Sequence, residues 1–508
     1  MEILHSVIFG FQVSLQPINL LYCFVGVFLG TLIGVLPGIG PIGTMAILLP
    51  ATFYAPPVSS IIMLAGIFYG AMYGGSTTAI LVNIPGEAAS VITCIDGYKM
   101  ARQGRAGPAL GIAAFGSFIA GTLGLVGLVL IAHPLARWAL KFGPPEFFSL
   151  MVLGLIILAF LAQKSFIKSI IMAALGLLLS YVGLDIVSGR ERFTLNIIDL
   201  MEGIGIVPIV MGLYGIAEIL ENLEVTVPRS IFKTHVKGLL PNLKDWRNSI
   251  GAILRGTGIG FLLGVLPGAA AIVSTFVSYG MEKKISKHPE RFGEGAIEGV
   301  AGPESANNAA ASGGFVPLMA LGIPPNGIMA MLFCGLLIHG LQPGPLLLRE
   351  HPDIFWGIIT SMYIGNVMLL ILNLPLIGMW IQILKVPFRL LFPVIILVCL
   401  VGVYSITISV FGIWVMIIFG VFGYFLKKCD YEFAPLVLAY VLGPMLENSL
   451  RQSLIMSKGS FAIFFSRPIS GVCFAIAVTL LIVSAASHLK GRIKRRRQRS
   501  SGDILKDG

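Results

Sequence analysis

GVLPGIGP, at residues 34–41, decides the fold, because it interrupts an apolar run that is otherwise long enough to cross a membrane. Proline removes a backbone donor and glycine tolerates unusual dihedral angles, so a helix is expected to break here. Broken backbone at membrane depth survives only where protein or a water-filled cavity satisfies its polar groups. For this motif in isolation, a plain loop between two helices is the alternative.

The break occurs twice. GVLPG recurs at residues 264–268, 230 residues later. A second pair of markers, GG at 74–75 and IP at 84–85, recurs at 313–314 and 323–324, 239 residues later. Markers in the same order at nearly the same offset indicate an internal duplication, and what the copies share is their Gly/Pro breaks.

The composition of the chain indicates whether it is surrounded by water or by lipid. Of 508 residues, 56% are hydrophobic and only 12% are charged, against about 25% charged in soluble domains. The mean hydropathy is +0.91. One span needs about 20 apolar residues. We therefore predict an all-α integral membrane protein with about 12 transmembrane helices in two homologous, inverted repeats that contain broken or re-entrant helices. The expected spans are 20–36, 58–82, 110–132, 147–162, 167–187, 203–220, 250–273, 315–337, 354–381, 386–400, 402–425 and 469–486.

Polar segments divide the chain into four parts. The first repeat is expected at 1–228 and the second at 250–487, with a connecting cytoplasmic loop at 229–249. Residues 488–508 form a basic tail that is expected in the cytoplasm, against anionic lipid, because clustered Lys and Arg favour that side. Nucleic-acid binding is not expected, since no folded basic domain accompanies the tail.

The first repeat carries oxygen-bearing side chains beside a break. Ser76, Thr77, Thr78 and Asn83 precede Pro85-Gly86 in an otherwise apolar run. Side-chain oxygens with freed carbonyls suit a cation such as Na⁺, and freed amides at a half-helix N-terminus suit an anion. The alternative is that each hydroxyl bonds back to its own helix.

The second repeat has a denser polar cluster. Glu304-Ser305 and Asn307-Asn308 lie in a run of alanine and glycine, followed by the break at Pro324-Pro325-Asn326. Such groups are costly to bury unless paired, and polar residues inside a membrane are candidates for function. Structural hydrogen bonding is the alternative. Asn366 and Asn373 are expected to act in helix packing, and 443–444 to interrupt a late apolar run.

The sequence lacks the motifs of metal-binding, metalloprotease and nucleotide-binding sites. The six cysteines have no metal-ligand spacing, and there is no HExxH pair and no GxxxxGK[ST] loop. We therefore expect no cofactor, no enzyme active site and no metal site beyond Na⁺. A carrier driven by an ion gradient remains.

Four stretches resemble one transporter family. YGAMYGGSTTAILVNIPGEAAS (69–90), DGYKMARQGRAG (96–107), GAIEGVAGPESANNAAASGG (295–314) and LIHGLQPGP (337–345) are similar to the large membrane subunit, TctA type, of tripartite tricarboxylate transporters. The resemblance covers nearly the whole chain. It implies a bacterial inner-membrane carrier with a small TctB-type membrane partner and a periplasmic TctC-type binding protein that delivers a carboxylate. Coupling to Na⁺ or H⁺ is implied likewise.

The repeat and the resemblance together give a mechanism. The broken segments of the two repeats should meet near mid-membrane around a pseudo-two-fold axis, and access should alternate by an elevator motion. Substrate carboxylates are expected at Ser76, Asn83, Pro85, Gly86, Ser305, Asn307, Asn308, Pro324, Pro325 and Asn326. Cations are expected at Gly38, Gly40, Thr77, Thr78 and Gly268. An anion channel is the alternative function, and a membrane-embedded enzyme is a more distant one.

Overall fold

The computed structural model describes residues 2–36, 39–161, 165–185, 187–224, 238–268, 270–384, 386 and 388–484. Gly38, part of the expected connecting loop and the whole basic tail lie outside these residues. Within them the regular secondary structure is helical apart from one short hairpin, in which β1 (Gly183–Leu184) pairs antiparallel with β2 (Glu191–Arg192).

The helices of the first half are α1 (Glu2–Ser14), α2 (Pro17–Gly34), α3 (Gly40–Leu48), α4 (Pro57–Val82), α5 (Val91–Met100), α6 (Ala106–Ala139), α7 (Pro144–Phe160), α8 (Phe166–Ser180), α9 (Ile206–Val210) and α10 (Ala217–Glu224). Those of the second half are α11 (Leu243–Gly264), α12 (Ala270–Ile285), α13 (Glu298–Leu321), α14 (Gly327–Ile338), α15 (Pro345–Glu350), α16 (Pro352–Asn373), α17 (Ile377–Ile383), α18 (Phe388–Thr407), α19 (Val410–Lys428), α20 (Ala434–Met456), α21 (Ile463–Ser466) and a final helix at Pro468–Ser484. Single 3₁₀ or π turns are η1 (Leu49–Thr52), η2 (Ala88–Ser90), η3 (Ala101–Arg105), η4 (Ile198–Leu200), η5 (Met211–Ile216) and η6 (Pro289–Arg291).

Among the described residues, seven helices are long and apolar enough to cross a membrane, judged by length and composition. Shorter apolar helices, such as α3, α7, α8 and α14, accompany them. Proline occupies the first turn of α2, α4, α7 and α16, where the missing N–H has no intrahelical partner to lose. The all-α architecture is thus confirmed, while the count of about 12 spans stays a prediction.

The helix ends agree with the expected duplication. α2 ends at Gly34 and α11 at Gly264, and each is followed by a valine with φ of −67°. α3 begins at Gly40 and α12 at Ala270, so the offset of 230 is kept. α4 and α13 each end in a left-handed residue at the offset of 239, Asn83 with φ 58° and Gly322 with φ 71°. These local correspondences are what a repeated unit produces.

The equivalent helices α4 and α13 run antiparallel. Ser76, late in α4, bonds Glu304, early in α13, at 2.6 Å. Tyr69, earlier in α4, stacks on Phe315, later in α13, with ring centroids 6.2 Å apart. Antiparallel equivalent helices are what inverted repeats would give, so this geometry supports the inverted arrangement.

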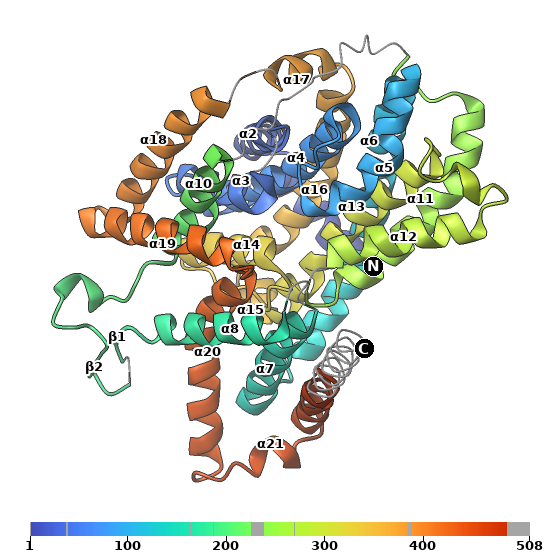
Figure 1. Ribbon diagram of the computed structural model, residues 1–508. Coiled ribbons are helices and arrows are strands. Elements are labelled where there is room, and N and C mark those ends of the chain that lie inside the picture. The colour runs from blue at the N-terminus through green and yellow to red at the C-terminus, as the bar shows by residue number, and fades with distance from the viewer. Residues whose placement is uncertain are drawn as a thin grey trace, which may run out of the picture.

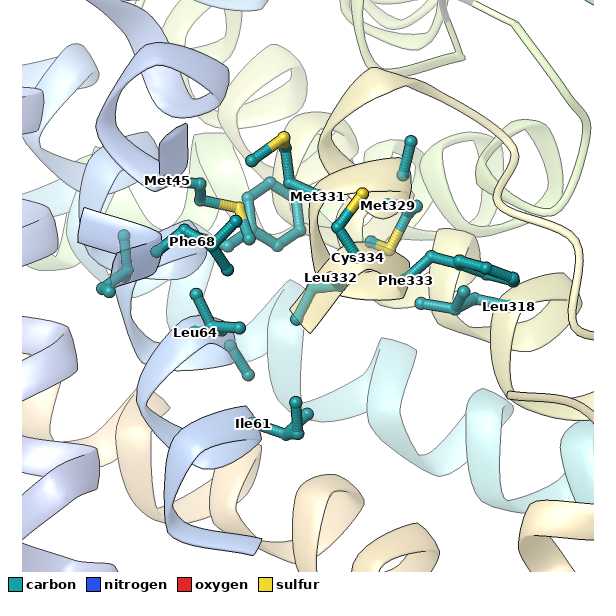
Figure 2. Packing of buried hydrophobic residues seen from close by; sticks show 14 of the residues in the cluster. Met45, Ile61, Leu64, Phe68, Leu318, Met329, Met331, Leu332, Phe333 and Cys334 are labelled. Atoms are coloured by element: carbon teal, nitrogen blue, oxygen red, sulfur yellow. The ribbon is translucent and has the colours of Figure 1, made fainter. Parts of the chain in front are cut away.

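α4 and α13 form the centre of the molecule, with α11 and α12 on one side of the view, α18 and α19 on the other, and α7, α8 and α20 below (Figure 1). Every residue from 59 to 81 and from 299 to 320 is buried. The largest apolar cluster joins the repeats: Leu64 and Phe68 of α4 face Met331, Leu332 and Cys334 of α14 (Figure 2).

Four expected spans are wrong because breaks divide them. The span 354–381 is split between α16 and α17, and the span 402–425 is split between α18 and α19. The span 250–273 is split between α11 and α12, and the span 315–337 is split at the left-handed Gly322 between α13 and α14. At residues 443–444, where a polar interruption of the apolar run is expected, the helix α20 continues through Pro444. Its N-terminal half packs on α7 and α8, and an i,i+4 pair between Glu447 and Arg451 at 2.6 Å supports the half beyond the proline.

Candidate functional site

A cavity of about 640 Å³ lies where the breaks of the two repeats meet. The first repeat contributes residues 39–43 and 85–89 to its lining, and the second contributes 268, 270–272 and 326–328. The end of α7, the segment from η5 to α10, and the residues from the end of α19 to the start of α20 complete the lining. The structure therefore brings the broken segments of both repeats to one place, with a volume typical of small-molecule sites.

Three helices begin at this cavity. α3 starts at Gly40, α12 at Ala270 and α14 at Gly327, and each of these residues lines the cavity. The first amides of a helix have no intrahelical acceptor, and its N-terminal end carries a partial positive charge. Three such ends around one cavity favour an anion.

Close backbone contacts shape both breaks. A Cβ on Gly86 would lie 2.3 Å from Cα of Gly75, so only glycine fits where the first break crosses α4. In the second repeat, the amide of Gly268 donates to the carbonyl of Pro325 at 2.8 Å and ties two breaks together. Asn326 caps α14 by accepting from the Met329 amide at 3.0 Å.

Behind the cavity lies a buried polar cluster whose hydrogen bonds join the two repeats. Glu304 accepts from Ser76 at 2.6 Å and from Thr93. The side-chain amide of Asn307 donates to Glu87 at 2.5 Å. Asn308 donates to Ser117 at 2.7 Å in the same way. Each of these bonds joins a residue of the first repeat to a residue of the second. Movement of one repeat against the other would therefore break or exchange them.

An ion-pair group stands at the edge of the cavity. Lys427 at the end of α19 donates to Glu218 and, at 2.6 Å, to Glu221 of α10. Lys427 is the one basic side chain among the described residues of the lining, which also holds Glu87 and Glu432. Tyr214, on the π turn η5, directs its hydroxyl toward Gly327 and makes no hydrogen bond within the described structure. Turns of this kind often mark functional positions.

The expected site residues fall into three groups. Gly40, Pro85, Gly86, Gly268 and Asn326 line the large cavity. Those buried behind it or in the polar cluster are Ser76, Thr77, Thr78, Ser305, Asn307, Asn308, Pro324 and Pro325. Asn83 is exposed at the end of α4 and is not part of the lining, and Gly38 lies outside the described residues.

Sequence reasoning missed Glu87, Thr93, Tyr214, Glu218 and Lys427. Glu87 could have been found, because it directly follows Pro85-Gly86 and occupies the position equivalent to Asn326, 239 residues later. Lys427 resembles a topology signal at the end of an apolar span, and only the fold shows that it reaches the cavity.

Comparison with known proteins agrees with this architecture. Residues 20–438 match the model of the tripartite tricarboxylate transporter TctA family. The chain is 49% identical, over 97% of its length and 98% of the relative's, to an "uncharacterized 52.8 kDa protein in TAR-I ttuC' 3'region" of Agrobacterium vitis. It is 46% identical to an "uncharacterized protein in TAR-II ttuC' 3'region" of the same organism, over 46% of this chain and 96% of that one. No solved structure matches.

The match covers both repeats and most of the helices around the cavity. A multi-pass helical chain of this family is a transporter subunit and not an enzyme. The chain belongs to the tripartite tricarboxylate transporter TctA family.

Proposed function

We propose that the chain is the membrane carrier that imports a di- or tricarboxylate, driven by a Na⁺ or H⁺ gradient across a bacterial inner membrane. A periplasmic TctC-type protein would deliver the substrate and a small TctB-type membrane subunit would complete the complex. The observation that carries the proposal is the cavity of about 640 Å³ at which α3, α12 and α14 begin. Helix N-termini at a break between repeats are how carriers hold anionic substrate groups.

The charges of the lining suit a carboxylate that does not travel alone. Lys427 and the helix ends favour the substrate anion, while Glu87, Glu218, Glu221 and Glu432 oppose it. Those of the four carboxyl groups that are ionised would repel a free di- or tricarboxylate at short range. A co-bound cation, or the release of Lys427 from Glu218 and Glu221, removes this opposition. The composition of the site thus supports coupling to a cation.

Packing supports an elevator motion. α2 lies so close to α4, and α11 to α13, that backbone meets backbone along both pairs. Because their backbones are in contact, the two helices of each pair are expected to move together as one rigid body. Between the repeats, α6 packs along α13 as closely as α11 does, so α6 is expected to move with α13. The side-chain hydrogen bonds from Ser76 and Asn307 to partners in the other repeat can exchange when one unit shifts.

The test is uptake of labelled carboxylates into proteoliposomes that contain the chain with its small membrane partner and a loaded binding protein. Saturable uptake that depends on the binding protein and on an inward Na⁺ or H⁺ gradient is the expected result. Flux that rises linearly with concentration and needs no gradient would instead make the chain a channel.

A further inference from the structure

Tyr214 has a buried hydroxyl group without a partner at the wall of the large cavity. The residue belongs to the π turn η5 and lines this cavity. Its hydroxyl oxygen is buried and makes no hydrogen bond within the described structure. A hydroxyl group that is buried without a partner costs free energy. Its presence here therefore points to a partner that this chain does not itself supply.

The hydroxyl group lies at the start of α14. A Cβ on Gly327, the first residue of this helix, would come 3.5 Å from the Tyr214 hydroxyl oxygen. The same Cβ would lie 3.1 Å from Cδ1 of Ile42 and 3.4 Å from Cβ of Ala434. Gly327 lines the cavity, and the absence of a side chain there keeps the first turn of α14 open to it.

The first turn of α14 supplies two further hydrogen-bond donors. The Asn326 side chain accepts from the Met329 amide at 3.0 Å, and the Asn326 carbonyl accepts from the Ala330 amide at 2.9 Å. The amides of Gly327 and Ile328, which both line the cavity, have no acceptor among the described residues. The hydroxyl and these two amides are three donors at the positive end of one helix. Such a set favours a carboxylate, which only accepts hydrogen bonds.

We propose that Tyr214 determines substrate specificity, because its hydroxyl and the amides of Gly327 and Ile328 bind one carboxylate group of the substrate. The inference rests on the proposed function for the class of ligand, and goes beyond it by assigning that group to one of the three helix ends. Because the hydroxyl oxygen is buried against α14, binding requires the Tyr214 ring to move aside far enough to admit a carboxylate oxygen.

A second anchor in the cavity favours a substrate with more than one carboxylate. Tyr214, Glu218 and Glu221 line the cavity at spacings of four and three residues, so they follow one face of the helix. Lys427 bonds both glutamates. It therefore lies about one to two turns, roughly 5–11 Å, from Tyr214 along this face. A monocarboxylate reaches one of these anchors, whereas a di- or tricarboxylate reaches both.

Thermal unfolding of the purified full chain tests this subsite without transport. The temperature midpoint is measured over a range of citrate, succinate and butyrate concentrations at constant Na⁺. Citrate or succinate should raise the midpoint in a saturable manner. Butyrate, which lacks the second carboxylate, should require at least about tenfold more. In Tyr214→Phe the half-saturating concentration of the di- or tricarboxylate should rise about tenfold, because a hydrogen bond to a charged group is lost.

The stability of the same variant without carboxylate separates binding from folding. The midpoint of Tyr214→Phe should then equal or exceed that of the wild type, since the substitution removes a buried hydroxyl that has no partner. Tyr69→Phe is the matched control: the Tyr69 hydroxyl is also buried without a partner in the described structure, but the residue does not line the cavity. Its half-saturating concentrations should be those of the wild type. Gly327→Ala, which places a methyl group at the helix end, should weaken binding as Tyr214→Phe does.

The outcomes distinguish the subsite from the proposed function. Equal half-saturating concentrations in the wild type and Tyr214→Phe would overturn the subsite, as would the absence of any carboxylate effect in the wild type. An equal loss in Tyr69→Phe would also overturn it. If the carboxylate effect follows the variants but no gradient-driven uptake occurs, the subsite stands and the proposed function fails. Gradient-driven uptake with a wild-type KM in Tyr214→Phe would support the proposed function and overturn the subsite.

Discussion

Lys427 and Lys428 are neighbours in the sequence with different surroundings. Lys427 lines the large cavity and bonds Glu218 and Glu221. Lys428 is half exposed and pairs with Glu224 at 2.9 Å, away from the cavity. Exposed pairs contribute little, whereas a cation in a cavity that takes anions selects what enters. One position along the helix therefore separates a cavity-lining charge from a surface charge.

This contrast gives a prediction for substrate affinity. Lys427→Gln removes the one basic side chain of the described lining, so KM for the carboxylate should rise about tenfold, the effect of losing a charge-assisted hydrogen bond. Lys427→Arg should retain most of the affinity, and Lys428→Gln is the matched control. Initial uptake rates over a range of substrate concentrations measure the effect. Equal KM values for the two glutamine variants would show that Lys427 does not contact the substrate.

A second prediction at this scale concerns acid stability. Arg451, Ser188 and the Val187 amide bond Asp185 beside the β1–β2 hairpin and hold the pKa of its carboxyl well below the ordinary value, with Arg192 adding to the effect. A lowered pKa stabilises the fold above the unfolded value of about 3.9, and this stabilisation is lost as the pH falls below it.

Asp185→Asn should therefore lower the melting temperature at pH 6 and flatten its fall between pH 5 and pH 3. The measurement is thermal unfolding in detergent across that range. Arg451→Met should flatten the same fall, and combining the two substitutions should add little. A wild-type slope in Asp185→Asn would show that other carboxyls control the acid transition.

At the scale of helices, glycine spacing fixes the repeat unit. Gly26, Gly30 and Gly34 lie on one face of α2, and a Cβ on any of them would come within 2.4 Å of a carbonyl oxygen of α4. α11 repeats the pattern against α13, where the corresponding distances for Gly256, Gly260 and Gly264 are at most 2.3 Å. Small residues at every fourth position allow this approach. The same contact appears in both repeats at their shared offsets.

We therefore predict equal sensitivity in the two repeats. Gly30→Ala and Gly260→Ala should each destabilise the protein by about 1–3 kcal/mol, since the added methyl meets backbone that cannot yield. Gly258→Ala is the control, because a Cβ there meets nothing within 4 Å on the same helix. Thermal unfolding in detergent compares the three. A loss for Gly258→Ala as large as for Gly260→Ala would point to helix propensity or lipid contact in place of helix packing.

For the whole molecule, the sequence predicts the class and the breaks well. The offsets of 230 and 239 residues are local signals, and the helix ends follow them. The continuation of α20 through Pro444 could not be read from the sequence, because tertiary packing overrides a local breaker. The pairing of Glu304 with Ser76 could not be read either, since it depends on how two distant helices cross. The sequence therefore identifies the polar residues of the candidate site, whereas their hydrogen-bond partners are known only from the folded structure.

The antiparallel crossing of α4 and α13 extends to a prediction for topology. If the repeats are inverted in the membrane, the connection before α4 and its equivalent before α13 face opposite sides. Tyr54, 76% exposed, and His288, also exposed, lie in these two connections. With Cys94 and Cys429 replaced by serine, Tyr54→Cys and His288→Cys should react with a membrane-impermeant maleimide from opposite sides of sealed vesicles. Labelling of both from one side would place the repeats parallel, and the three helix ends at the cavity would then need an explanation other than inverted symmetry.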